Sequence, residues 1–459
     1  MAGGSHGHEV PLNVTLLFMA MLVGLIACLA LEEKIHAKKS VIVGVFAVLS
    51  LLLGGWFGIL PFGDLTNPFG EKIRMPVFIP AVDWSVIFII LGSSVFVDVT
   101  SKSGLFTWIA IRLTKLSGGD PLKLLVYYGL MTVIFSAVLN NVTAMIIVGS
   151  LTGVSLGKLG RNDKLLGFLL VEGLLTNVGG LLTLISSVPN IIVGTAAGIS
   201  FVNFLLAAAP YVVVATIATL FLGAKIFKIS GLPNAEEKER AQKLIAGFDE
   251  NDGIESEMFF WFGGMMTLLF VVTIATTSVL PVVSELGMAF VAVGFATVML
   301  VRYKSEVDRF YKGVDWDLLG FFVGLFITIN VMEHAQVLSL MGVGLAKVID
   351  LGDTLGTGLI LAAAAFFSSV TDNIPLAAML AKILTQLQTP TDSSLWWSVV
   401  FGANLGGNLT PIGSASTLVA ITIIHKYKLP MSFAGFVKAA LPFAVMQIAM
   451  AAAYVLVFL

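Results

Sequence analysis

Charged residues and cysteine are scarce in this chain. Only 12% of its 459 residues are Asp, Glu, Lys or Arg, about half of the charged share of an ordinary soluble protein, whereas 57% are hydrophobic. A water-soluble globule could not bury that much apolar surface, but a lipid bilayer accommodates it. The single cysteine, Cys28, excludes an internal disulfide and a cysteine-based zinc site. The net charge of −2, without a basic stripe, gives no footprint for nucleic acid.

Motifs of catalysis and of processing are also missing. Neither HExxH, GxSxG nor a pair of catalytic aspartates occurs in the apolar segments, so we expect no enzyme activity and no cofactor. Residues 1–10 contain no Lys or Arg and do not resemble a cleaved signal peptide. His6, His8 and Glu9 offer metal-binding side chains, but we interpret them as part of a solvated tail and expect no metal site.

Long apolar segments follow one another along the chain, each close to the length of about 20 residues that a membrane-spanning helix needs. We expect an all-α polytopic membrane protein with five crossings in each half, one of them interrupted by polar residues. Two further apolar segments, 121–157 and 354–388, break in the middle. The predicted crossings are 12–31, 41–60, 84–100, 165–198 (interrupted) and 201–224, then 258–280, 284–301, 316–333, 396–424 (interrupted) and 433–459.

The second half of the sequence repeats the first at a constant shift in residue number. Asn140-Asn141 corresponds to Asp372-Asn373 at a shift of 232, and between such anchors the run 177–180 corresponds to 404–407 at a shift of 227. Chance does not supply an ordered set of matches at one shift. We therefore divide the chain into a first repeat (1–224), a charged linker (225–257) and a second repeat (258–459). Further pairs at the shift of 232 are Val82-Asp83-Trp84 with Val314-Asp315-Trp316, Phe135-Ser136 with Phe367-Ser368, Ser200-Phe201 with Ser432-Phe433, and Pro210 with Pro442.

The distribution of basic residues predicts that the two repeats are inverted. If both broken segments are re-entrant hairpins, each half crosses the membrane five times, and an odd number turns the second half upside down. The Lys and Arg residues then fall on the cytoplasmic side, as the positive-inside rule demands, except Lys72, Arg74, Lys347 and Lys382. The protein is therefore expected in the inner membrane, with the linker in the cytoplasm and both termini outside it.

Polar residues and glycines interrupt the apolar segments at four places, the hairpin tips 139–143 and 371–375 and the breaks 177–190 and 404–417. Backbone leaves a helix at membrane depth only where it is buried in protein or lines a polar cavity. Asn, Ser and Thr supply neutral donors and acceptors, and exposed half-helix ends add partial charge. A single polar residue is as often a contact between helices, and one break is often a packing kink. Breaks at corresponding positions of both halves favour a binding site near the midplane.

Three carboxylates in the apolar segments are candidate proton carriers, because charge at membrane depth is costly and usually functional. Asp372 lies at the second hairpin tip, where its repeat partner is the neutral Asn140. Glu172 lies inside an interrupted crossing, and Asp98 lies near the end of a span. The alternatives are a helix cap, a buried hydrogen-bonded acid and an interfacial position, respectively. No Lys or Arg is expected in the middle of a span, which argues against a polyanionic substrate.

Sequence runs at these places resemble a known family. "TDNIPLAAML" at 371–380, "FGANLGGNLTPIGSASTLVA" at 401–420 and "LNNVTAMI" at 139–146 are most similar to the arsenite efflux permeases (ArsB). They also resemble the P-protein and NhaD sodium/proton antiporter branches of the ion transporter superfamily, and the resemblance spans nearly the whole chain. It implies a site that contains Asp372 together with the substrate-binding residues Asn140, Asn141, Thr143, Asn177, Asn373, Asn404, Asn408, Thr410, Ser414 and Ser416.

The resemblance implies export of arsenite or antimonite coupled to proton influx, with a sodium/proton antiporter of the NhaD type as the alternative. The acids that the P-protein and antiporter branches would carry are replaced here by Ser186-Ser187 and by Ser414. A sodium site favours charged oxygen ligands, whereas a neutral trihydroxy solute needs only neutral partners. The expected partners are the metalloid, protons and the lipid bilayer. A cytoplasmic ATPase subunit, which the resemblance allows, and a channel mechanism stay open.

The predicted orientation can be tested with reporter fusions. A reporter that is active only outside the cytoplasm should be active at either terminus and inactive within the linker 225–257, because the basic residues place the linker inside. A terminal reporter found in the cytoplasm would contradict the inverted arrangement.

Overall fold

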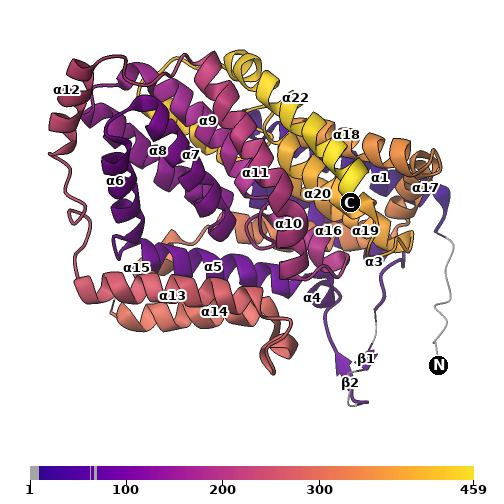
Figure 1. Cartoon of the computed structure of the whole chain (residues 1–459). Coiled ribbons are helices and arrows are strands. Elements are labelled where there is room, and N and C mark those ends of the chain that lie inside the picture. The colour runs from indigo at the N-terminus through magenta and orange to yellow at the C-terminus, as the bar shows by residue number, and fades with distance from the viewer. Residues whose placement is uncertain (1–9, 63, 67–69, 306) are drawn as a thin grey trace.

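The chain is nearly all-helical (Figure 1). The structure, a computed structural model, describes residues 10–62, 64–66, 70–305 and 307–459. His6, His8 and Glu9 lie outside the described residues. Within these ranges, 10 helices are long and apolar enough to cross a membrane. They are α1 (Leu12–Ala30), α3 (Lys39–Trp56), α5 (Trp84–Ser101), α7 (Pro121–Val138), α11 (Phe201–Ile226), α13 (Glu257–Ala275), α14 (Val283–Arg302), α16 (Trp316–His334), α18 (Asp353–Val370) and α22 (Phe433–Phe458).

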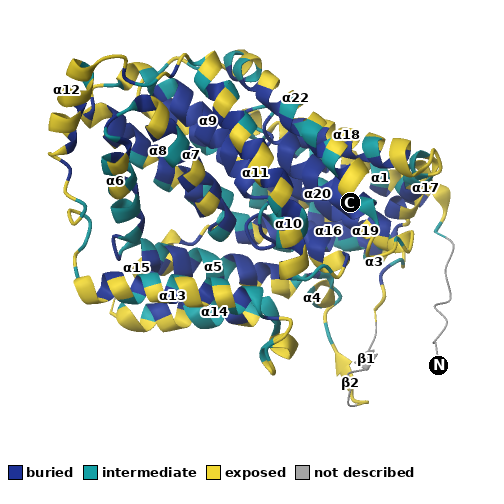
Figure 2. Ribbon diagram, in the orientation of Figure 1, coloured by how far each residue is buried: buried dark blue, intermediate teal, exposed yellow. Residues whose placement is uncertain are grey.

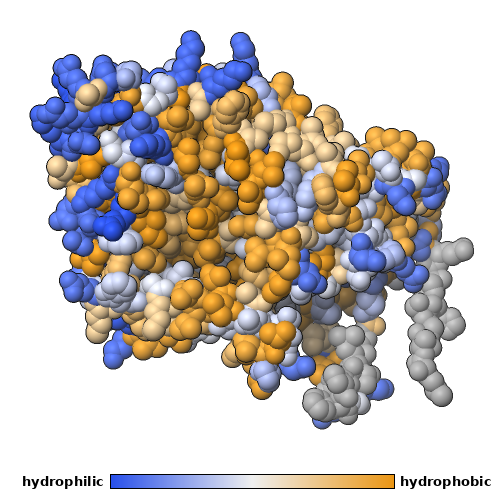
Figure 3. Space-filling model, viewed as in Figure 1, coloured by the Kyte–Doolittle hydropathy of each residue, from blue (hydrophilic) through white to orange (hydrophobic). Residues whose placement is uncertain are grey.

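The prediction of a helical polytopic membrane protein is confirmed, with one addition. A two-stranded antiparallel sheet, β1 (Asp64–Thr66) and β2 (Lys72–Arg74), follows α3. Hydrophobic residues cover much of the visible surface, whereas hydrophilic residues gather around the linker helix α12 (Ala235–Ile245), as Figure 3 shows. Such a surface is suited to lipid rather than to water. The remaining short elements are α2 (Glu32–Ile35), α4 (Phe78–Ala81), η1 (Asn162–Lys164) and α15 (Val307–Gly313).

Both broken segments form helical hairpins. In the first, α7 is followed by α8 (Asn141–Lys158), and in the second, α18 is followed by α19 (Asn373–Gln386). The break has a local cause in each, because the residue at the tip caps the helix that follows it. Oδ1 of Asn140 accepts a hydrogen bond from the backbone N–H of Thr143 at 2.8 Å, and Oδ1 of Asp372 accepts from that of Ile374 at 3.1 Å.

In each interrupted crossing the first helix ends at a glycine and the second begins after a serine, with a proline in or next to the break. The first comprises α9 (Leu165–Gly179) and α10 (Val188–Ala196), and the second comprises α20 (Ser394–Gly406) and α21 (Ala415–Lys426). Almost the entire circumference of α9 is buried, and this helix lies in the interior of the helix bundle in Figure 2. A helix that is apolar all round needs such a place. The breaks therefore lie deep inside the protein.

Corresponding helices of the two halves begin and end at the same shift in residue number. The helix α6 (Leu105–Ser117) corresponds in this way to α17 (Val337–Ile349), and the pairs α7 with α18 and α11 with α22 keep the same spacing. The helices α6 and α17 are not among the predicted crossings, because they are shorter than a span and amphipathic. The equal spacing agrees with the sequence repeat, and the inverted relation of the halves stays a prediction.

The halves are packed into each other rather than side by side. The first-half helix α5 lies along α14 of the second half, and α3 lies along α16. Glycine permits both contacts: a Cβ atom on Gly92 of α5 would come within 2.5 Å of the backbone of Ala292, and one on Gly324 of α16 within 3.0 Å of the Val43 side chain. Gly92 and Gly324 occupy corresponding positions of the two repeats.

The linker is fastened to the ends of the first-half helices. Arg161 lies 2.8 Å from Glu237 of α12, and Glu250 pairs with Lys115 and, at 3.5 Å, with Arg112. The hydrogen bond from Lys115 lowers the pKa of the Glu250 carboxyl below its ordinary value. These pairs hold the linker against α6 and α8.

Substitution of Gly92 by alanine should lower the thermal midpoint of the detergent-purified protein. The added methyl group meets backbone that cannot turn away, and overpacking of this kind costs about 1–3 kcal/mol. Gly294→Ala on α14 is the matched control, because a Cβ there meets nothing within 4 Å. Thermal unfolding is measured as the loss of the monodisperse peak in size-exclusion chromatography after heating. Equal thermal midpoints of the two variants would contradict the close approach of α5 and α14.

Candidate functional site

Both hairpin tips and both helix breaks meet at one cavity of about 270 Å³. Asn140 and Asn373 come from the tips, and Asn177 and Ser414 come from the breaks. The remaining wall comes from α5 and from the junction of α15 with α16. The lining residues are Ser94, Asn140, Asn141, Val142, Thr143, Ile146, Asn177, Ser186, Ser187, Val188, Pro189, Gly313, Asp315, Leu318, Asn373, Ile374, Ser414, Ala415 and Ser416.

Four helices begin at this cavity. The first residues of α8, α10, α19 and α21 all belong to its lining. The first backbone N–H groups of a helix have no partner within the helix, and the helix dipole adds partial positive charge there. The cavity is therefore suited to a solute rich in oxygen atoms. Asp315 is the one charged residue among the described lining residues.

Asn177, in the cavity lining, connects the two halves. Its Nδ2 donates hydrogen bonds to Oδ1 of Asn408 at 2.8 Å and to Oγ of Ser414 at 2.9 Å. Its Oδ1 accepts from Nδ2 of Asn141 at 3.3 Å and from Oγ of Ser416 at 3.1 Å. Both donor hydrogens and both acceptor sites of this buried amide are used, which fixes the orientation of the side chain.

The second break makes the corresponding contact with the first. Oγ of Ser187 donates to Oδ1 of Asn404 at 2.6 Å. At the repeat shift of 227, Asn404 corresponds to Asn177 and Ser187 corresponds to Ser414, so each asparagine reaches the serine at the opposite break. The hairpins are attached in the same reciprocal way, since Ser136 donates to the carbonyl oxygen of Thr176 and Ser368 donates to that of Ala403.

The structure brings most of the predicted substrate-binding residues together. Three of them lie outside the cavity lining and take part in the surrounding hydrogen bonds. Nδ2 of Asn404 donates to Oδ1 of Asn190 at 2.9 Å, Nδ2 of Asn408 donates to Oε1 of Gln447 at 2.7 Å, and Thr410 donates to the carbonyl oxygen of Ser369. Those in the lining are Asn140, Asn141, Thr143, Asn177, Asn373, Ser414 and Ser416.

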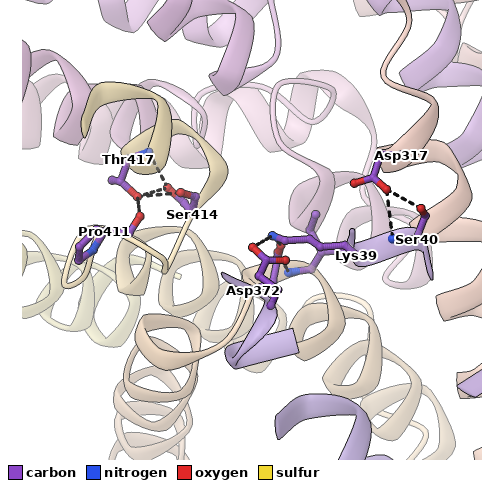
Figure 4. Close-up of polar contacts among 9 residues, drawn as sticks. Lys39, Ser40, Asp317, Asp372, Pro411, Ser414 and Thr417 are labelled. Carbon is purple, nitrogen blue, oxygen red and sulfur yellow. Dashed lines mark hydrogen bonds and ion pairs between the residues drawn. The ribbon is translucent and has the colours of Figure 1, made fainter. Parts of the chain in front are cut away.

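The three carboxylates predicted for proton coupling lie outside the cavity lining. Asp372 precedes the lining residue Asn373 but faces the other side of the hairpin tip, where it pairs with Lys39 (Figure 4). Glu172 is fully buried on α9; its Oε1 accepts from Thr152 at 2.6 Å, and Oε2 has no partner among the described residues. Asp98 is half-buried near the end of α5, which contacts α15.

Three polar residues near the site were missed by the sequence analysis. Lys39 is predicted only as one of the basic residues on the cytoplasmic side, where membrane orientation already explains its charge. Gln447 carries a signal that could have been used, since an amide in the middle of a predicted span needs a partner; it contacts Asn408 and, at 2.9 Å, Thr219. Asp315 caps α16, and a capping residue at the start of a span gives no signal in the sequence that it also lines a cavity.

Comparison with known proteins places the chain among membrane transporters. The model of the citrate transporter (CitMHS) family matches residues 26–401. The 46 kDa membrane protein of Mycobacterium leprae is 30% identical over 379 residues, which cover 81% of this chain and 86% of that protein. The arsenical pump membrane protein of Escherichia coli is 23% identical over 435 residues, covering 91% and 94%. The mycobacterial protein is thus the more similar of the two, and the expected nearness to the arsenite permeases is not established.

A solved structure shares the fold. The YdaH transporter of Alcanivorax borkumensis superposes with a TM-score of 0.60 at 14% sequence identity, over 97% of this chain and 98% of that one. Identity this low supports the fold alone. The family model covers more than half of the chain, and the mycobacterial relative matches over most of both sequences. The chain therefore belongs to the citrate transporter (CitMHS) family of membrane transporters.

Proposed function

We propose that this transporter exports arsenite and antimonite from the cytoplasm across the inner membrane in exchange for protons. The observation that carries the proposal is the largely neutral lining of the cavity, where amide and hydroxyl groups of Asn141, Asn177 and Ser414 surround the space. Arsenite at neutral pH is an uncharged trihydroxy molecule. It requires donors and acceptors rather than a charged anchor, and binding without a thiolate suits a carrier that must release its solute.

Asp372 is the proposed proton carrier. It lies at the tip of the second hairpin, next to Asn373 in the cavity lining, and its side chain is 9% exposed. A carboxylate in this position can take up a proton where protons are abundant and release it on the other side. Glu172 is a second candidate, since it is buried and one of its oxygens lacks a partner among the described residues. Asp98 is a third.

The proposed motion follows from the division into two inverted repeats, 1–224 and 258–459, joined by the linker 225–257. Each repeat supplies one hairpin and one broken helix, which would move as a unit against α3, α5, α14 and α16. The cavity wall includes Gly313 and Asp315, at the end of α16 that the basic residues predict to be cytoplasmic. A solute leaving the cell would enter from this side. A cytoplasmic ATPase subunit is not required by this mechanism.

A small carboxylate is the second candidate substrate. Two observations favour it: four helix N-termini surround the cavity, and the family is described by citrate transport. The absence of Lys and Arg from the described cavity lining weighs against a free tricarboxylate. Sodium/proton exchange stays the alternative to both, and sodium-dependent proton release from vesicles would reveal it.

Uptake of radiolabelled arsenite into energised everted vesicles tests the proposed substrate. We expect accumulation that collapses when a protonophore dissipates the proton gradient, because uptake into everted vesicles corresponds to export from the cell. Unlabelled antimonite should compete and citrate should not. Competition by citrate, with no arsenite uptake in vesicles that contain folded protein, would favour the carboxylate candidate.

Asp372→Asn should lower proton-driven arsenite accumulation at least about tenfold while arsenite exchange continues, because the amide cannot carry a proton. Asp353→Asn at the exposed start of α18 is the matched control on the same hairpin and should behave like the wild type. Full proton-driven accumulation in the Asp372→Asn variant would remove this residue from the mechanism.

A further inference from the structure

An ion pair ties the second hairpin to the first half of the chain. Nζ of Lys39, the first residue of α3, lies 2.7 Å from Oδ2 of Asp372 (Figure 4). Oδ1 of Asp372 is meanwhile engaged as the cap of α19. The other side-chain hydrogen bonds described for α18 and α19 stay within the hairpin or run to α16, to α20 and to the break that follows α20. The pair is thus the one side-chain polar contact between the hairpin and α3 among the described residues.

The two partners belong to parts of the protein that are anchored differently. The start of α3 is fixed to α16, because the backbone N–H of Ser40 donates to Oδ1 of Asp317 at 3.3 Å and the Ser40 hydroxyl donates to the same oxygen. Figure 4 shows this contact directly beside the ion pair. Lys39 is therefore held by the α3–α16 pair, whereas Asp372 is carried by the hairpin.

The hairpin is loosely packed on the side that faces α1. An apolar cavity of about 540 Å³ lies between α1, α17, α18 and α19, and its lining includes Ile26, Leu345 and Leu376. The cavity is open at the surface, since Leu359 and Phe367 of its lining are exposed, and few packing contacts hold the hairpin to α1 there. Asp372 itself belongs to the lining of this cavity. The ion pair accordingly carries much of the attachment on this side.

A second acceptor for the ammonium group lies close by. Oε1 of Glu32, on α2, is 3.7 Å from Nζ of Lys39. The charged groups around the pair are Glu32 and Lys34 from α2 and Asp317 from α16, whereas α1, α22 and the second break contribute the apolar Leu29, Phe433 and Ile412. Lys39 can therefore exchange Asp372 for Glu32 by a small movement, without losing an ionic partner.

We propose that the Lys39–Asp372 pair locks the second hairpin to α3 and that a proton taken up by Asp372 opens this lock. The inference rests on the proposed function, in which Asp372 carries the coupling proton. A hydronium ion gives a proton to one carboxylate oxygen of Asp372 and leaves as water, and no other covalent bond is formed or broken. Lys39 keeps its three protons and turns to Glu32. The neutral carboxylic acid then moves away with the hairpin.

The lock explains how an unproductive movement is prevented. A hairpin that left Lys39 with an ionised Asp372 would carry an unpaired carboxylate along an apolar surface, which is strongly unfavourable. Protonation also removes the Coulomb attraction between the carboxylate and the ammonium group, so it weakens the attachment while it removes the penalty. Movement without a proton is thereby suppressed, and Lys39 is a positioning residue for coupling rather than a ligand of the solute.

A double-mutant cycle tests the lock through the pH dependence of arsenite exchange in vesicles, an activity that Asp372→Asn is expected to keep. In Lys39→Gln the ion pair that holds the hairpin is lost, so exchange should extend to a higher pH than in the wild type. Asp372→Asn should be insensitive to pH, and the double variant Lys39→Gln/Asp372→Asn should equal Asp372→Asn alone. Lys34→Gln, in the same cavity wall, is the control and should keep the wild-type profile. Additive effects of the two substitutions, or an unchanged profile in Lys39→Gln, would overturn the proposal.

A second readout is independent of the substrate. In a Cys28→Ser background, Leu376→Cys places a thiol in the apolar cavity one turn beyond Asp372. At a fixed pH of about 7, N-ethylmaleimide should label this thiol about five- to tenfold faster in Lys39→Gln and in Asp372→Asn than in the parent. The double variant should be labelled as fast as either single variant. Equal labelling rates in all variants and the parent would contradict the lock. Labelling as expected, without arsenite transport by the parent, would retain the lock and reject the substrate; transport with unchanged labelling and pH profiles would do the reverse.

Discussion

Non-helical backbone inside a bilayer has to find its hydrogen-bond partners within the protein. In this transporter carbonyl oxygens at each break accept hydrogen bonds from side chains of the same break, that of Gly180 from Asn190 and that of Pro411 from Thr417. The side chains of the two breaks then bind each other, since Asn177 reaches Ser414 and Asn404 reaches Ser187. The hairpin tips are then held on the same helices through Ser136 and Ser368. The cavity exists because these contacts hold the two hairpin tips and the two breaks together around one space. A buried amide left without its partner costs about 1–3 kcal/mol, so the site and the fold depend on the same side chains.

In the proposed mechanism the arrangement separates solute recognition from charge. The cavity offers mostly neutral groups and helix N-termini, while the candidate proton carrier Asp372 lies one residue away and faces its own cation. A neutral solute and a charged coupling group would interfere with each other if they shared one surface, because each desolvates the other. In the proposed cycle the two are connected through the hairpin backbone, from Asn373 on one side of the tip to Asp372 on the other.

Much of this architecture could be predicted from the sequence because the signals are local and repeated. Hydrophobic length predicts the spans, and Asn140 and Asp372 mark the hairpin tips because each caps the helix that follows. The constant shift between the repeats predicts which segments correspond. Contacts between distant segments could not be predicted in the same way. Lys39 gave only the signal of a basic loop, and its pairing with a residue 333 positions away depends on the packing of whole helices. The part of the cavity wall formed by Asp315, Gly313 and Ser94 has the same origin.

The pairing of α5 with α14 and of α3 with α16 has a consequence for biosynthesis. Each first-half helix of these pairs rests on a helix that lies far along the chain and is not yet made when the first half enters the membrane. At a synthesis rate of about 5–20 residues per second, α3 and α5 wait on the order of ten seconds or more for their partners. During this interval the face of α5 around Gly92 contacts lipid or the insertion machinery. The first half is therefore inserted before its partner helices exist, and the rate of translation sets how long these helix faces stay exposed.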